Sequence, residues 1–283
     1  MKRPFLLAPV VLSLVAAPAA MAQGEAFGVN LRGTVNLRQF PANDPSQMGN
    51  IVGATISTYA MDFNTAGTLL YAVRNTDGSN LNLTFGTIDT STGGFSPIAD
   101  VTGLPVDAVP TGLSVDPTTE TIYLSTAWEL FTLNPVTGAA TLIGDFGADL
   151  GIMIDIAVDN NGNMYGHNSG ADALFSIDKT TGLATQIGLS HGMNANFAQG
   201  MDFDPTTNTL YAAIYISGGQ GHYVSWDTTT GEVTVLADTL PFDVEMELAI
   251  RVPAPGALAL VGLGGLVAVR RRRPAGLVRQ TNP

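Results

Sequence analysis

Four carboxylates occupy alternate positions in short, otherwise apolar segments of this chain: Asp62, Asp155, Asp202 and Glu247. If these segments are strands, the alternation places the four side chains on a common face. Carboxylates held close together repel one another unless they are protonated or bridged by a cation, and Ca²⁺ takes about six to eight oxygen ligands of this kind. We therefore hypothesise a divalent-ion site, with Ca²⁺ as the ion. The alternative is that the side chains are solvated or bond neighbouring repeats.

The sequence contains no recognisable catalytic or zinc-binding motif. The histidines, His167, His191 and His222, lie in separate repeats without the paired spacing of a zinc motif. The chain has no Cys, no Gly-x-Ser-x-Gly elbow and no phosphate loop. Aromatic residues suited to stacking on sugars fit better as packing groups within strands: Trp128, Tyr215, Tyr223 and Trp226. No catalytic residue is assigned, and the sequence favours a protein that is not an enzyme.

One pattern occurs four times and consists of an apolar strand ending near an acidic or amide residue, a strand with a Tyr, a third strand and a turn with Thr-Gly. The ends of the first strands lie at 61–64, 113–116, 156–159 and 201–204. The second strands carry Tyr71, Tyr123, Tyr165 and Tyr211. Alternate apolar residues in the first strands, such as Met61 and Phe63, predict a buried face.

The turn has the form Asp/Asn-x-x-Thr-Gly and is clearest in Asp178–Gly182 and Asp227–Gly231. The Asp or Asn side chain accepts hydrogen bonds from the following backbone, and Gly takes the left-handed conformation that closes the hairpin. An apolar residue follows each Gly after five positions, and we expect these residues to anchor the next strand: Ile98, Ile143, Ile187 and Leu236.

The repeats follow one another at steps of 52, 43 and 45 residues, which is the length of a four-stranded propeller blade. Leu248–Ile250 fits a fifth first strand, while Thr34–Phe40 and Gln47–Gly53 fit the third and fourth strands of the same blade. We predict an all-β propeller of about five blades over residues 23–251, closed by strands from both termini. This part of the chain resembles the bacterial propellers related to WD40, NHL and YVTN repeats.

The N-terminal segment has the features of a secretory signal. Lys2 and Arg3 precede an apolar run, and Ala20 and Ala22 supply the small-x-small pattern for signal peptidase, so we expect residues 1–22 to be removed before Gln23. The alternative is a retained membrane anchor, which the shortness of the run and its prolines disfavour.

The C-terminal segment combines three parts in a fixed order. Val252, Pro253, Ala254 and Pro255 form an extended protease-accessible stretch, residues 257–269 are apolar, and a cluster of four arginines follows: Arg270, Arg271, Arg272 and Arg273. The apolar part is expected to enter the inner membrane as a helix with the arginines on the cytoplasmic side, which leaves 274–283 as a cytoplasmic tail. A plain membrane anchor is the alternative.

Residues 252–273 resemble the PEP-CTERM sorting signals of Gram-negative bacteria, although Ala254 stands where that family usually has Glu. The resemblance implies processing by an exosortase-type transpeptidase, after signal peptidase has acted, with transient attachment to the inner membrane. The mature protein is then expected at the cell surface, in the outer envelope or in the extracellular matrix.

Charge limits the partners of the part between the two termini. Residues 23–251 carry 24 acidic and only five basic side chains, so this surface repels nucleic acid. We expect an exported binding or structural propeller whose ligand is a polysaccharide or a surface protein. The alternative is an exported enzyme, a lactonase-like or glycan-active hydrolase with a divalent metal in the central channel.

Overall fold

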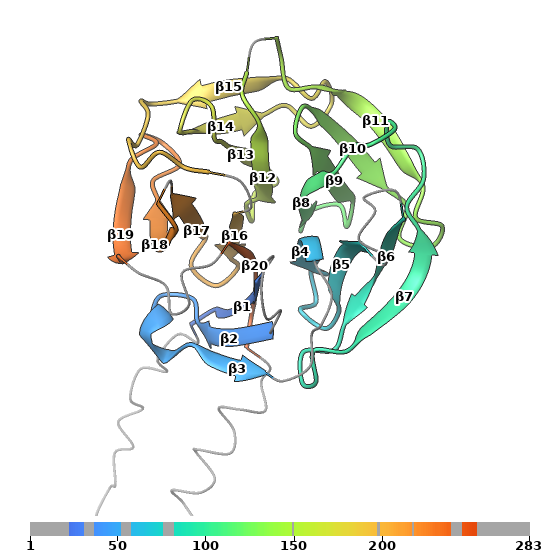
Figure 1. The fold of residues 1–283 in the computed structure, drawn as a ribbon, viewed down its shortest axis with the longest axis horizontal. Coiled ribbons are helices and arrows are strands. Elements are labelled where there is room, and N and C mark those ends of the chain that lie inside the picture. The colour runs from blue at the N-terminus through green and yellow to red at the C-terminus, as the bar shows by residue number, and fades with distance from the viewer. Residues whose placement is uncertain are drawn as a thin grey trace, which may run out of the picture.

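Five four-stranded antiparallel sheets stand around a central axis as the blades of a propeller (Figure 1). The computed structural model describes residues 23–30, 37–51, 58–75, 82–148, 150–196, 199–216, 218–238 and 245–253. The predicted all-β class, the five blades and the four strands in each are confirmed.

Each blade is named by its order in the chain, and each has an innermost, a second, a third and an outer strand. Blade 1 contains β20 (Met246–Arg251), β1 (Glu25–Asn30), β2 (Leu37–Pro41) and β3 (Gly49–Ile51), with the 3-10 turn η1 (Pro45–Gln47) before β3. Blade 2 contains β4 (Thr58–Phe63), β5 (Leu70–Asn75), β6 (Leu83–Ile88) and β7 (Phe95–Asp100). Blade 3 contains β8 (Pro110–Val115), β9 (Ile122–Thr126), β10 (Glu129–Leu133) and β11 (Ala140–Asp145). Blade 4 contains β12 (Met153–Val158), β13 (Met164–Asn168), β14 (Ala173–Ile177) and β15 (Ala184–Ile187). Blade 5 contains β16 (Gly200–Asp204), β17 (Thr209–Ile216), β18 (Gln220–Trp226) and β19 (Val233–Ala237).

The hydrophobic core lies between the blades. Among the described residues there are five apolar clusters, and each joins two neighbouring blades. The alternating apolar residues of the innermost strands belong to them, as Met61 and Phe63 show, which are 1% and 4% exposed. The sheets therefore cohere by burying apolar surface face to face around the ring.

Strands from both ends of the described chain close the ring in blade 1. β20 pairs with β1 from Glu25↔Arg251 to Asn30↔Met246, so the last innermost strand is held by the first strand of the chain. Arg251 forms an ion pair with Glu25 at 2.8 Å and stacks on the ring of Phe27. This closure leaves every innermost strand paired within its blade and in contact with the next.

The Asp/Asn-x-x-Thr-Gly turns form as predicted and also touch the neighbouring blade. In the turn that ends at Gly231, the backbone N–H groups of Thr229 and Thr230 donate to Asp227, and Gly231 has a φ of 75°. A Cβ at Gly231 would lie 2.3 Å from the carbonyl oxygen of Ile187 in blade 4. Glycine is thus required here both by the left-handed backbone and by the close approach of the next blade.

Two expectations need correction. The apolar residues after the turns are not all anchors, because Ile98 and Leu236 are 43% and 39% exposed on outer strands. The outer strands have no further sheet to pack against. The second strand of blade 1, β1, had no counterpart among the predicted strands.

The predicted signal peptide, the residues from Ala254 onward and the apolar run at 257–269 lie outside the described residues. Within the described residues, no helix has the length and apolar character needed to span a bilayer.

Candidate functional site

The four carboxylates lie on innermost strands and are buried at the centre of the ring. Asp62 is on β4, Asp155 on β12, Asp202 on β16 and Glu247 on β20, with exposed fractions of 1% to 7%. All four lie on the strands nearest the axis, and among the described residues no three of them have ligand atoms within 4.8 Å of one another. They are not solvated channel residues, as one alternative had suggested.

Each carboxylate bonds the innermost strand of the next blade, and Ser114 of β8 completes the circle. The donors are backbone N–H groups, and the bonds are Val115 to Asp62 at 2.7 Å, Val158 to the Ser114 hydroxyl at 3.0 Å, Met201 to Asp155 at 2.5 Å, Ile250 to Asp202 at 2.5 Å and Met61 to Glu247 at 3.3 Å. Five side chains therefore link the five blades in one direction around the axis.

The five polar side chains form two layers along the axis. Asp62, Ser114 and Asp202 make one layer, and Asp155 and Glu247, two residues earlier in their strands, make the other. Small residues fill the complementary positions, and a Cβ at Gly112 would lie 2.3 Å from an oxygen of Asp155. Each innermost strand thus contributes one polar and one small residue to the centre.

Burial raises the pKa of each of these carboxyls. Removal from water raises the pKa of Asp62 to about 7 and outweighs the hydrogen bond from Val115, which lowers it. Burial also raises the pKa of Asp155, Asp202 and Glu247 well above the usual range, and repulsion between the carboxyls adds to the effect. One oxygen of Glu247, Oε2, is buried and has no hydrogen-bond partner.

Cavities lie at both ends of the innermost strands. The smaller, about 140 Å³, lies at the strand ends that follow Asp62 and Asp202. The larger, about 650 Å³, lies at the opposite ends, where the innermost strands begin. We call the larger one the wide mouth, and its lining includes Tyr59, Thr111, Trp128, Ile154, Gln199 and Glu247.

The wide mouth places an aromatic side chain at the surface. Trp128 lies in the loop between β9 and β10, and 63% of it is exposed. The other Trp differs, since Trp226 is buried and its indole N–H donates to the carbonyl of Gly231 at 3.0 Å. Tyr223 is buried too, and its hydroxyl donates to the carbonyl of Ala42. The packing interpretation is confirmed for Trp226 and Tyr223 and is wrong for Trp128.

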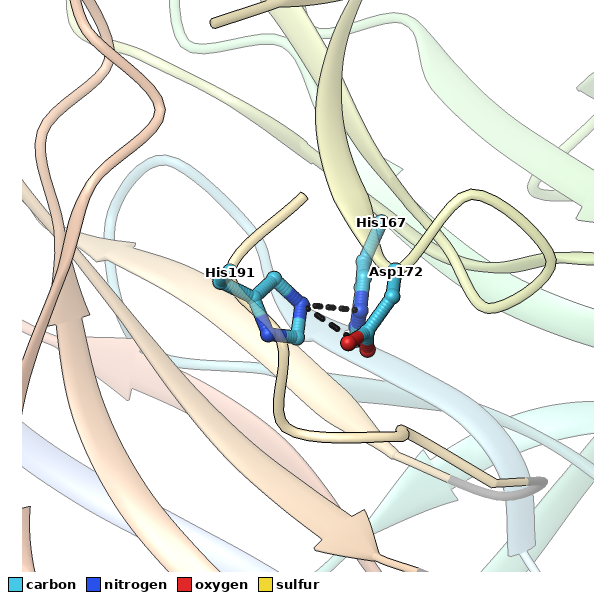
Figure 2. Close-up of side chains that lie close together, drawn as sticks. All are labelled: His167, Asp172 and His191. Carbon is cyan, nitrogen blue, oxygen red and sulfur yellow. Dashed lines mark hydrogen bonds and ion pairs between the residues drawn. The ribbon is translucent and has the colours of Figure 1, made fainter. Parts of the chain in front are cut away.

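Sequence reasoning missed a second cluster, formed by His167, Asp172 and His191 (Figure 2). His167 is on β13, Asp172 lies in the turn after that strand, and His191 lies between β15 and β16. Burial lowers the pKa of both histidines, and the nearby His191 lowers that of His167 further. The residues are separate in sequence, so their spacing gave no signal. In the described part of the chain, this is the only set of three such groups whose ligand atoms lie within 4.8 Å of one another.

The residues of the predicted sorting motif are described as far as Pro253. Val252 follows β20 directly and is 49% exposed, so the chain leaves the propeller at the surface. The remaining processing residues, Ala20, Ala22, Ala254, Pro255 and Arg270–Arg273, lie outside the described residues.

Solved structures resemble this chain, whereas no family model and no curated protein sequence matches it. A chain from the crystal structure of a nidogen/laminin complex is similar with a TM-score of 0.50 and 12% identity, over 80% of this chain and 97% of that one. A Bacteroides uniformis protein provisionally named a 6-phosphogluconolactonase has a TM-score of 0.47 and 12% identity, over 77% and 83% of the two chains. TolB from Acinetobacter baumannii has 0.48 and 14%, over 80% of this chain and 55% of that one. At 12% identity the likeness to the chain from the nidogen/laminin complex concerns the fold alone.

Proposed function

We propose that this chain is an exported, surface-located binding propeller, and that its ligand occupies the wide mouth. The observation that carries the proposal is the cavity of about 650 Å³ with Trp128 exposed on its rim. Its size lies in the range of about 300–1,000 Å³ that is usual for small-molecule sites. A few polar groups converge on it, including the hydroxyl of Thr111, the amide of Gln199 and the carboxyl of Glu247.

A neutral saccharide is the ligand that this chemistry fits best. An exposed indole offers a flat apolar face for a sugar ring, and the hydroxyl, amide and carboxyl groups offer hydrogen bonds to its hydroxyls. The excess of acidic residues in 23–251 disfavours anionic polymers. We therefore place a polysaccharide ahead of a surface protein as the partner.

Export and sorting rest on the two termini. The chain leaves the propeller at an exposed Val252, where a protease can reach the backbone that precedes the Ala254-Pro255 motif. We propose that signal peptidase removes residues 1–22 and that an exosortase-type enzyme processes the chain near Pro253. The propeller is then released from its transient anchor to the cell surface or matrix.

The enzyme alternative has less support. It requires at least three of the four central carboxylates to share one ion, and among the described residues no group of three that includes them has ligand atoms within 4.8 Å. Each carboxylate instead accepts a backbone N–H from the next blade. Binding of Ca²⁺ by the central carboxylates stays a prediction.

Binding is tested by calorimetric titration of the protein with neutral glucan and mannan oligosaccharides, alongside an anionic uronic-acid polymer. We expect a neutral oligosaccharide to bind and Trp128→Ala to weaken binding by about 30-fold, because truncating an aromatic anchor costs about 2 kcal/mol. The control is Val136→Ala, a truncation at a residue that is 76% exposed and outside the wide mouth. Unchanged affinity in Trp128→Ala would refute the assignment of the site.

A further inference from the structure

The cluster of His167, Asp172 and His191 joins two segments at the boundary of blades 4 and 5 (Figure 2). His167 and Asp172 belong to blade 4, and His191 belongs to the linker that leads into blade 5. His167 is 1% exposed, and the side chain of His191 is fully buried. Two imidazoles and a carboxylate facing one another in a buried place are the donor set of a transition-metal site.

The two distances from His191 to the other ligands match tetrahedral coordination. Nε2 of His191 lies 3.2 Å from Nε2 of His167 and 3.3 Å from Oδ1 of Asp172. Zinc binds nitrogen and oxygen ligands at about 2.0–2.1 Å, so the edges of its ligand tetrahedron are about 3.3–3.4 Å long. Both separations from His191 therefore match the spacing that a bound ion needs, and the ligand atoms of His167 and Asp172 lie within 4.8 Å of each other.

The surroundings hold these ligands in place. The carboxylate of Asp172 accepts backbone N–H groups from Asn194 and Ala195, both at 2.9 Å. Trp226 of blade 5 packs edge-on against both imidazoles, with ring centroids 4.8 Å from His167 and 5.3 Å from His191. Supporting contacts of this kind fix ligand orientation in metal centres.

Imidazole nitrogens bind transition metals, and Asp172 adds a carboxylate oxygen beside the two histidines. A hydrogen bond between the two neutral rings accounts for the same Nε2–Nε2 distance, so a metal titration separates the two explanations.

We propose that His167, Asp172 and His191 bind a divalent transition-metal ion, with Zn²⁺ as the favoured ion. Water takes the fourth coordination position. The ion would tie the linker after β15 to blade 4 beside Trp226. None of these three residues lines the wide mouth, although Gln199, which does, contacts His167, and the proposed ion does not depend on the proposed saccharide.

The experiment uses the full chain purified without a histidine tag. We expect one equivalent of Zn²⁺ to bind and to raise the melting temperature, and Co²⁺ to give the intense visible absorption of a four-coordinate complex. Ca²⁺ and Mg²⁺ should give neither response, because they prefer sets of oxygen ligands. With Trp128→Phe removing the other indole signal, Co²⁺ should quench the emission of Trp226, which touches both histidines.

His167→Ala and His191→Gln should each weaken Zn²⁺ binding by at least about 100-fold, which exceeds the usual cost of losing a supporting contact alone. His222→Gln is the matched control, since it removes the one other histidine and should leave binding unchanged. If a ligand variant does not fold, X-ray absorption of the Zn²⁺ complex of His222→Gln remains decisive, because two imidazole ligands must then be His167 and His191. Absence of stoichiometric binding, or a complex with no imidazole ligands, would overturn the proposal.

Discussion

At the scale of single residues, the central carboxyls make stability depend on pH. Their pKa values are raised in the folded state, to about 7 for Asp62, so the folded chain binds more protons than the unfolded chain above about pH 4. Their stabilising contribution is full below that pH and is lost as the pH rises through the folded pKa.

We therefore expect the free energy of unfolding to fall between pH 5 and pH 8, by at most about 1.4 kcal/mol per pH unit for each group. Asp62→Asn imitates the protonated carboxyl, so it should reduce the loss between pH 5 and pH 7. Urea unfolding of both proteins at several pH values measures the effect. A parent protein that gains stability from pH 5 to pH 8 would contradict it.

The sequence predicted some of these residues and not others. The carboxylates were found because strand alternation and the repeat place them at equivalent positions, and Trp128 was noted but assigned to packing. His167 and His191 were not paired, because they lie 24 residues apart in a strand and in a linker. Only the tertiary contact of the linker with the turn after β13 brings them together.

At the scale of elements, the turns join blades as well as closing hairpins. Gly231→Ala forces a Cβ into left-handed backbone and to within 2.3 Å of the Ile187 carbonyl oxygen. Gly192→Ala has nearly the same φ, 73°, and nothing within 4 Å of its added Cβ. In the control, Gly192→Ala, the free energy of unfolding should fall only by the backbone cost of about 1–2 kcal/mol. In Gly231→Ala it should fall by at least about 1 kcal/mol more, because the neighbouring blade must move.

Chemical denaturation of the two metal-free variants measures that difference, and equal losses would show that the turn does not hold the blades together.

Strand parity, turn chemistry and the repeat length predicted most elements, because all three are local. β1 was missed because it belongs to an incomplete copy of the repeat, whose innermost strand lies at the other end of the chain.

At the scale of the whole molecule, the sequence predicted a closed ring from an interrupted blade, and the pairing of β1 with β20 confirms it. The cavity of the wide mouth was beyond prediction, because its lining comes from separate loops and from the starts of several innermost strands. We propose delivery of the propeller to the outside of the cell on the basis of the two terminal segments.

That delivery is tested most directly by mass spectrometry of the mature termini in fractionated cells that make the protein. We expect a species beginning at Gln23, ending close to Pro253 and recovered from the cell surface or the surrounding matrix. Recovery of the intact 283-residue chain from the cytoplasm would contradict both the export and the processing.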